Sequence, residues 1–264
     1  LGSARVRNMD YAAPAGELSA TLKQDRASWP VAHRRAVRTT LEDWHSALEI
    51  RSDSRGIAPK DKAARLTRVC RRLGRCMGLS VRVEGRVPDG PCLIVANHLS
   101  YLDPLALGQV LGVGAVAKSE IKAWPGVGEA VANLGIVFVK RGCARSGAVA
   151  LRKMMRMLEA GVPVVVFPEG TTTTGGDVLP FSRGAFGVAR LLRVPVVPAT
   201  LRYDSDEVPW VGDDSLLPHA IRMHRHHGVE ARIVFGPGLP PTAFDSAEEL
   251  AEATRRCIRS LLLP

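Results

Sequence analysis

The sequence predicts an α/β fold in which helices flank a largely parallel central sheet. From about residue 80 onward, short apolar runs typical of buried strands alternate with longer segments of helical periodicity. Strands that alternate with helices usually pair in parallel, because each helix carries the chain back across the sheet. The chain has 264 residues, of which 46% are hydrophobic, and is long enough to bury a large core.

We expect three parts along the chain. Residues 1–30 mix Gly, Ala, Ser and Pro among charges, which indicates a loosely structured terminus. Residues 31–77 carry two segments of helical spacing and predict an amphipathic helical pair, joined by a linker at 51–60. The α/β domain then occupies 78–264. Its strands are predicted near 80–85, 92–97, 115–118, 136–140, 163–167, 195–203 and 230–235, and its helices near 103–111, 126–134, 145–160, 183–193, 215–226 and 246–262.

The second helix of the predicted pair is basic on one side and apolar on the other. Its apolar face carries Leu66, Val69, Leu73 and Met77, and the opposite face carries Lys62, Arg65, Arg68, Arg71, Arg72 and Arg75. This pattern favours an anionic membrane surface as partner, and a solvated helix packed on the domain explains it equally well. No charge-free apolar run reaches the roughly 18–20 residues that span a bilayer. We therefore expect a protein of the cytoplasm that associates peripherally with the inner face of the cell membrane.

The charge balance restricts the partners. A formal net charge of +10 and a pI near 9.9 favour anions such as lipid headgroups, acidic carrier proteins or nucleic acid. Aromatic residues make up only 5% of the chain and are not interleaved with basic ones, so we expect no nucleic-acid partner. The five cysteines form no C-x-x-C pair, which predicts neither a disulfide framework nor a zinc site.

The first candidate for catalysis is a histidine followed five residues later by an aspartate. His98 follows the apolar run Cys92–Ala96, and Asp103 is placed to be the N-cap of a helix whose first residue is Pro104. A histidine at a strand end can face an aspartate at the next helix start, as a general base held by a carboxylate does. The alternative is a loop histidine beside an ordinary helix cap.

Three further stretches come at or after predicted strands. The strand 135–139 ends in Lys140 and Arg141, which could grip a phosphate or carboxylate or could be a solvated strand end. After another apolar strand, Glu169 and Gly170 open a hydroxyl-rich loop that could approach a ligand or form a surface turn. The run 194–198 is an apolar strand bracketed by prolines and has no chemical group of its own.

Four histidines near the C-terminal part raise the question of a metal. His219, His224, His226 and His227 have no carboxylate or cysteine close by in the sequence, and two arginines intervene. Ligand geometry for a metal is exacting, so we expect no metal and no cofactor.

In this order, the stretches NHLSYLD, GIVFVKR, FPEGT and VPVVP resemble the motifs of the glycerolipid acyltransferase family, which includes the bacterial 1-acylglycerol-3-phosphate acyltransferases. The family patterns are N-H-x-x-x-x-D, G-x-x-F-x-x-R, F-P-E-G-T and V-P-V-x-P, and the resemblance spans about residues 80–200. The segment from Trp210 to His219 is similar to the branch that acts on lyso-ornithine lipid and lysophosphatidate.

The resemblance implies an O-acyltransferase with a glycerolipid-acyltransferase-like α/β domain. A fatty acyl group would pass from acyl-CoA or acyl carrier protein to a lysophospholipid, first of all 1-acyl-sn-glycerol 3-phosphate, giving phosphatidate. His98 would be the general base and Asp103 its orienting partner, with direct attack on the thioester. The substrate-binding residues implied by the resemblance are Asn97, Lys118, Arg141, Glu169, Gly170, Thr171, Thr172 and Arg183.

One position departs from the family pattern. Many relatives carry Arg after F-P-E-G-T, where it helps to bind phosphate, and this chain has Thr172. A phosphate pocket would then depend on Arg141, Lys118 and Arg183, and lyso-ornithine lipid or another lyso-acceptor is an open alternative. From a different class, a non-catalytic peripheral protein could use the pocket only to bind lipid, but intact His98 and Asp103 favour an enzyme.

Overall fold

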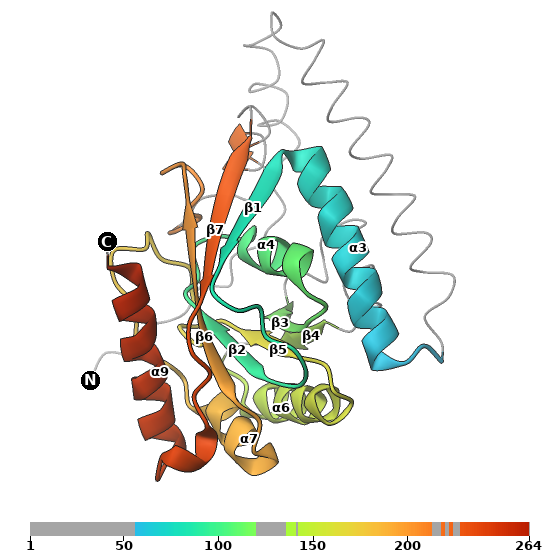
Figure 1. Cartoon of the computed structure of the whole chain (residues 1–264), viewed down its shortest axis with the longest axis vertical. Coiled ribbons are helices and arrows are strands. Elements are labelled where there is room, and N and C mark those ends of the chain that lie inside the picture. The colour runs from blue at the N-terminus through green and yellow to red at the C-terminus, as the bar shows by residue number, and fades with distance from the viewer. Residues whose placement is uncertain are drawn as a thin grey trace, which may run out of the picture.

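The computed structural model describes residues 56–119, 136–140, 142–212, 218–219, 222–223 and 228–263 (Figure 1). The predicted helices at 31–50 and 126–134, and most of the one at 215–226, lie outside these residues. So does the loosely structured terminus expected at 1–30. None of the described helices is both long and apolar enough to cross a bilayer.

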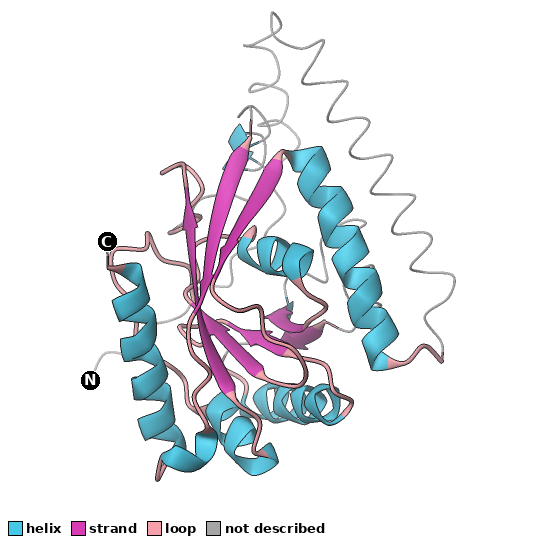
Figure 2. Cartoon of the chain, viewed as in Figure 1, coloured by secondary structure: helices cyan, strands magenta, loops and turns pink. Residues whose placement is uncertain are grey.

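A seven-stranded sheet lies at the centre of the described residues (Figure 2). The strand order is β1-β7-β6-β2-β5-β3-β4. Every neighbouring pair is parallel except β6 with β7, which run antiparallel, so the predicted largely parallel sheet is confirmed. The strands are β1 (Leu79–Glu84), β2 (Leu93–Ala96), β3 (Gly114–Lys118), β4 (Val137–Val139), β5 (Val164–Val166), β6 (Val196–Tyr203) and β7 (Val229–Phe235).

Helices cover both faces of this sheet (Figure 1). Helices α3 (Pro59–Met77) and α4 (Asp103–Val110) lie on one face, and α6 (Ala144–Glu159), α7 (Gly184–Leu192) and α9 (Ala247–Leu262) lie on the other. Successive residues of β2 alternate between the two cores. Ile94 packs with the α3–α4 side and Leu93 with the α6–α7–α9 side. Because both faces are covered, the central strands are apolar throughout rather than alternating.

Helix α3 is part of the packed structure rather than a detached arm. It lies against α4 and β1, and its Leu66 and Cys70 are buried in the core that the sheet shares with α4. The same burial raises the pKa of the Cys70 thiol to about 12. How the chain divides into independently folding units stays a prediction.

The predicted start of α4 needs a correction of one residue. The N-cap is Leu102, and Asp103 is the first residue of the helix rather than its cap. No side chain caps α4, because the Asp103 carboxylate accepts hydrogen bonds from the loop before the helix instead. The Asp103 carboxylate therefore stabilises the loop that carries His98 rather than the start of the helix.

The loops that follow β2, β5 and β6 meet at one edge of the sheet. These three strands are parallel neighbours, with β2 between the other two. Their carboxyl ends therefore lie side by side, which is where α/β proteins usually bind ligands. Residues 97–102, 167–182 and 204–212 make up these loops.

Candidate active site

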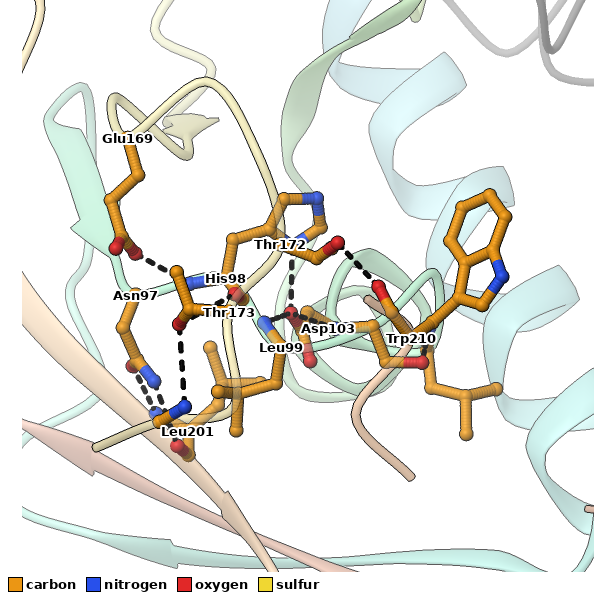
Figure 3. Close-up of polar contacts among 12 residues, drawn as sticks. Asn97, His98, Leu99, Asp103, Glu169, Thr172, Thr173, Leu201 and Trp210 are labelled. Carbon is orange, nitrogen blue, oxygen red and sulfur yellow. Dashed lines mark hydrogen bonds and ion pairs between the residues drawn. The ribbon is translucent and has the colours of Figure 1, made fainter. Parts of the chain in front are cut away.

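His98 and Asp103 form a close pair at the carboxyl end of β2 (Figure 3). The His98 Nδ1 atom lies 2.7 Å from Oδ2 of Asp103. The carboxylate is completely buried, while the His98 side chain keeps 17% of its surface exposed. Since Nδ1 faces a carboxylate, it carries the proton and Nε2 holds the free lone pair. This is the arrangement of a general base held by an aspartate.

Four donors hold the Asp103 carboxylate. Besides His98, the backbone N–H groups of Leu99 and Ser100 donate to Oδ2 over 2.6 and 2.9 Å. The hydroxyl of Tyr203 donates to Oδ1 over 2.7 Å. A buried carboxylate is costly unless such donors compensate for lost water. The backbone of the loop and the end of β6 therefore fix the aspartate in place.

The amide side chain of Asn97 joins β2 to β6. Its Nδ2 donates to the carbonyl of Leu201 over 3.1 Å, and its Oδ1 accepts from the Leu201 N–H over 2.8 Å. The side chain thus continues the β2–β6 ladder for one residue beyond β2. Asn97 was predicted to contact substrate. In the structure, both polar atoms of its side chain are instead bonded to the backbone of Leu201.

Glu169 connects the loop after β5 to His98. Its Oε1 accepts from the His98 N–H, and its Oε2 accepts from the Leu179 N–H, both over 2.9 Å. Burial raises the pKa of the Glu169 carboxyl, while the two backbone hydrogen bonds act in the opposite direction. Glu169, predicted to contact the acceptor headgroup, is thus seen in the structure to hold the backbone N–H groups of His98 and Leu179.

The imidazole of His98 also rests on an aromatic ring from the same loop. The Phe167 ring lies parallel to it, with centroids 4.2 Å apart and an interplanar angle of 20°. The carbonyl of His98 accepts from the Thr173 N–H over 2.8 Å. His98 is therefore held through its ring, its N–H and its carbonyl by residues of one loop.

Part of this loop faces solvent, and part of it contacts a neighbouring loop. Gly170 and Thr171 are exposed, and Gly170 has a φ of +73° with open space where a Cβ would stand. The Thr172 hydroxyl donates to the carbonyl of Trp210, whose own N–H donates to Leu99 over 2.8 Å. Thr172 thus links the loop after β5, through Trp210, to the loop that carries His98.

Of the three cationic side chains predicted to form a phosphate pocket, the structure describes one. Arg183 has 74% of its side chain exposed and pairs with Glu248 in the first turn of α9. Arg141 and the side chain of Lys118 lie outside the described residues.

Four residues of the site were missed by the sequence analysis: Phe167, Thr173, Tyr203 and Trp210. Phe167 begins the FPEGT stretch and Thr173 follows it, and their contacts with His98 become visible only in three dimensions. Tyr203 carried a usable signal, because it ends the strand that begins within the VPVVP block. A tyrosine at that strand end lies at the same sheet edge as His98.

One of the four grouped histidines is described and has structural partners. His219 is buried, with Nδ1 3.1 Å from the Tyr101 hydroxyl and Nε2 3.1 Å from the carbonyl of Glu207. The other three lie outside the described residues. Within the described part of the chain, no three His, Cys, Asp or Glu side chains gather as metal ligands would.

Comparisons with known proteins agree on one kind of enzyme. The acyltransferase family model matches residues 80–202. The lyso-ornithine lipid O-acyltransferase of Pseudomonas aeruginosa is 34% identical over 196 residues, covering 72% of this chain and 75% of that protein. The 1-acyl-sn-glycerol-3-phosphate acyltransferase of Neisseria gonorrhoeae is 29% identical over 184 residues, covering 69% and 72%.

A solved structure supports the fold. The chain is similar to the crystal structure of the 1-acyl-sn-glycerophosphate acyltransferase PlsC from Thermotoga maritima, with a TM-score of 0.60 and 22% identity. The match covers 86% of this chain and 96% of that one. The α/β architecture described above is therefore shared with a known acyltransferase.

Proposed function

Because this chain belongs to the acyltransferase family, we propose that it moves a fatty acyl group from a thioester to the hydroxyl of a lysolipid, with His98 as general base. The observation that carries the proposal is the 2.7 Å contact between His98 Nδ1 and Asp103. It leaves Nε2 as the basic atom of a partly exposed ring.

In the proposed reaction, Nε2 of His98 takes the proton of the acceptor hydroxyl as its oxygen attacks the thioester carbonyl. Asp103 holds the imidazole in the required tautomer and stabilises the imidazolium that forms. The tetrahedral intermediate collapses with cleavage of the C–S bond, and the thiolate leaves with the proton that His98 returns. The products are an ester and a free thiol, and no acyl group is attached to the enzyme.

The donor we propose is acyl-CoA or an acyl carrier protein. Both present the thioester that the mechanism needs, and both are anionic. The net charge of +10 supports attraction of either one.

For the acceptor we propose lyso-ornithine lipid, with 1-acyl-sn-glycerol 3-phosphate as the second candidate. This reverses the order expected from the motifs, for two reasons. The position where many relatives have a phosphate-binding Arg is Thr172, and its hydroxyl is engaged by the Trp210 carbonyl. The relatives from Pseudomonas aeruginosa and Brucella abortus named for lyso-ornithine lipid are 34% and 32% identical over 72% of this chain. The second candidate is supported by the Neisseria relative.

We also propose that the enzyme works at an anionic membrane surface, on its cytoplasmic side, where lysolipids reside. Lys60, Arg68, Arg71 and Arg75 are exposed and follow one another at spacings of three, four or eight residues along α3. At these spacings they share one face of the helix. A row of cations of this kind favours anionic lipid headgroups.

An acyl-transfer assay on the full chain tests the proposal. The donors are acyl-CoA and acyl carrier protein, and the acceptors are lyso-ornithine lipid, lysophosphatidate and lysophosphatidylcholine as a comparison lipid. Release of free thiol together with lipid analysis measures transfer. We expect the highest turnover with lyso-ornithine lipid, and a turnover about 10³-fold lower with His98→Ala. Full activity of His98→Ala would refute the mechanism, and no turnover of any lysolipid would refute the function.

A further inference from the structure

We propose that Tyr203 is a positioning residue of this site, which acts on His98 through Asp103. Its hydroxyl lies 2.7 Å from Oδ1 of Asp103, whereas His98 uses Oδ2. The inference rests on the proposed function, in which His98 is the base. It adds a third side chain to the pair that the sequence motif contains.

The fold holds Tyr203 firmly where it makes this contact. It is the last residue of β6 and pairs with Ala231 of β7 on one side of the strand. On the other side, Leu201, two residues earlier, is tied to the Asn97 amide. The end of β6 is thus fixed against the start of the loop that carries His98, which places the Tyr203 side chain beside Asp103.

The chemistry of the contact assigns the direction of the hydrogen bond. An ionised carboxylate can only accept, so the phenol must donate. Burial and the nearby Asp103 charge raise the pKa of Tyr203 well above its usual value. The hydroxyl therefore keeps its proton in any ordinary buffer. A hydrogen bond between a hydroxyl and a charged carboxylate is about twice as strong as one between neutral groups.

The two oxygens of Asp103 have different partners. Of the hydrogen bonds described, those from His98, Leu99 and Ser100 reach Oδ2, and the one from Tyr203 reaches Oδ1. Without Tyr203, a buried oxygen loses its donor and the carboxylate keeps more of its charge. A more negative carboxylate attracts the imidazolium form of His98 more strongly. Tyr203 thereby tunes the base as well as holding it in place.

The first test compares Tyr203→Phe with Tyr101→Phe. Both variants remove one phenol hydroxyl, but the described hydrogen bond of the Tyr101 hydroxyl is to His219. For Tyr203→Phe we expect kcat to fall about tenfold, the acceptor KM to stay within about twofold, and the acid limb of kcat/KM to move up by about half a pH unit. Tyr101→Phe should leave the midpoint of that limb in place. An unmoved limb in Tyr203→Phe would overturn the proposal.

A fluorinated tyrosine keeps the shape of the ring and should shift the acid limb of the pH profile in the opposite direction. 3-Fluorotyrosine at position 203 retains the hydroxyl and makes it a stronger donor, so the acid limb should move to lower pH. This variant applies even if Tyr203→Phe folds poorly, since the hydroxyl and its contact remain. If Tyr203 had only a structural role, Tyr203→Phe and the fluorinated form would not move the acid limb in opposite directions. A shift of both forms in the same direction would therefore count against the proposal.

A measurement without substrate separates this inference from the proposed function. We expect the NMR titration of the His98 ring nitrogens to shift to higher pH in Tyr203→Phe and to lower pH with 3-fluorotyrosine. If these shifts occur and the wild-type protein acylates no lysolipid, the proposed function fails and the positioning role stands. If the wild-type protein acylates lysolipids and the titration is the same in all forms, the positioning role fails alone.

Discussion

Two loops meet at His98, and they differ in where their polar groups point. The catalytic loop, residues 97–103, buries Asn97, Ser100 and Asp103 and directs them inward. The acceptor loop, residues 167–182, is anchored by Glu169 but leaves Gly170 and Thr171 exposed. We infer that the first loop sets the geometry of the base, while the second supports it from one side and offers its outer side to the acceptor.

The largest effect is expected in the catalytic loop at the base itself. His98→Ala removes the proton acceptor, and we expect kcat to fall about 10³-fold, within the range attributed to general-base catalysis. Thermal unfolding should also become easier, because the fully buried Asp103 carboxylate loses one of its four donors. Steady-state kinetics and circular dichroism check both points. Retention of a tenth of the activity would contradict the assignment.

The next effect comes from the carboxylate. Asp103→Asn turns one acceptor oxygen into an NH2 group that faces donors, so we expect kcat to fall about 10²-fold and unfolding to become easier by about 1–3 kcal/mol. Asp177→Asn is the matched control, because that carboxylate is exposed, where it pairs with Arg259 and accepts from the Val178 N–H. Urea unfolding and kinetics would distinguish them. Equal behaviour of the two variants would break the contrast between buried and exposed carboxylates.

A smaller effect is expected where the acceptor loop grips the base. Glu169→Gln can satisfy one of the two N–H groups of His98 and Leu179 but presents a donor to the other. We expect kcat/KM to fall about tenfold and unfolding to become easier by about 1–2 kcal/mol. Glu248→Gln, an exposed glutamate paired with Arg183, should change neither quantity. A change in acceptor KM alone would assign Glu169 to binding rather than support.

The smallest effect belongs to the link between the acceptor loop and Trp210. Thr172→Val removes the hydroxyl that donates to the Trp210 carbonyl and keeps the side-chain shape. We expect the acceptor KM to rise about threefold, while kcat stays within about twofold, because the contacts of His98 and Asp103 persist. Thr174→Val, an exposed neighbour, is the control. A large loss of kcat would show that the acceptor loop also governs the chemistry.

The sequence could predict features that depend on neighbours in the chain. The spacing of His98 and Asp103 places both on one short loop, and the alternation of elements predicts the parallel sheet. The start of α4 is off by one residue because Asp103 serves the preceding loop rather than its helix. Periodicity says whether a segment is a strand but not which strand it pairs with. The antiparallel pairing of β6 with β7 was therefore out of reach.

Contacts between distant parts of the chain were also beyond prediction. Asn97 and Leu201 are 104 residues apart, and Asp103 and Tyr203 are 100 residues apart. They meet only because β6 lies next to β2, although six described strands and helices stand between the catalytic loop and β6 in the sequence. Glu169 belongs to a matched motif, yet its clamp on His98 depends on the same strand order.

The placement of α4 has a mechanical consequence. Its first residue is Asp103, and in its last turn the Gln109 carbonyl accepts a hydrogen bond from Nε of Arg71 in α3. Eight residues of helix form a rod about 12 Å long that is too short to bend appreciably. We infer that a shift of α3 along its own axis, as attachment to the proposed anionic surface would produce, is passed through α4 to the Asp103 carboxylate. On this inference, the proposed membrane attachment and the alignment of the proposed base are mechanically coupled.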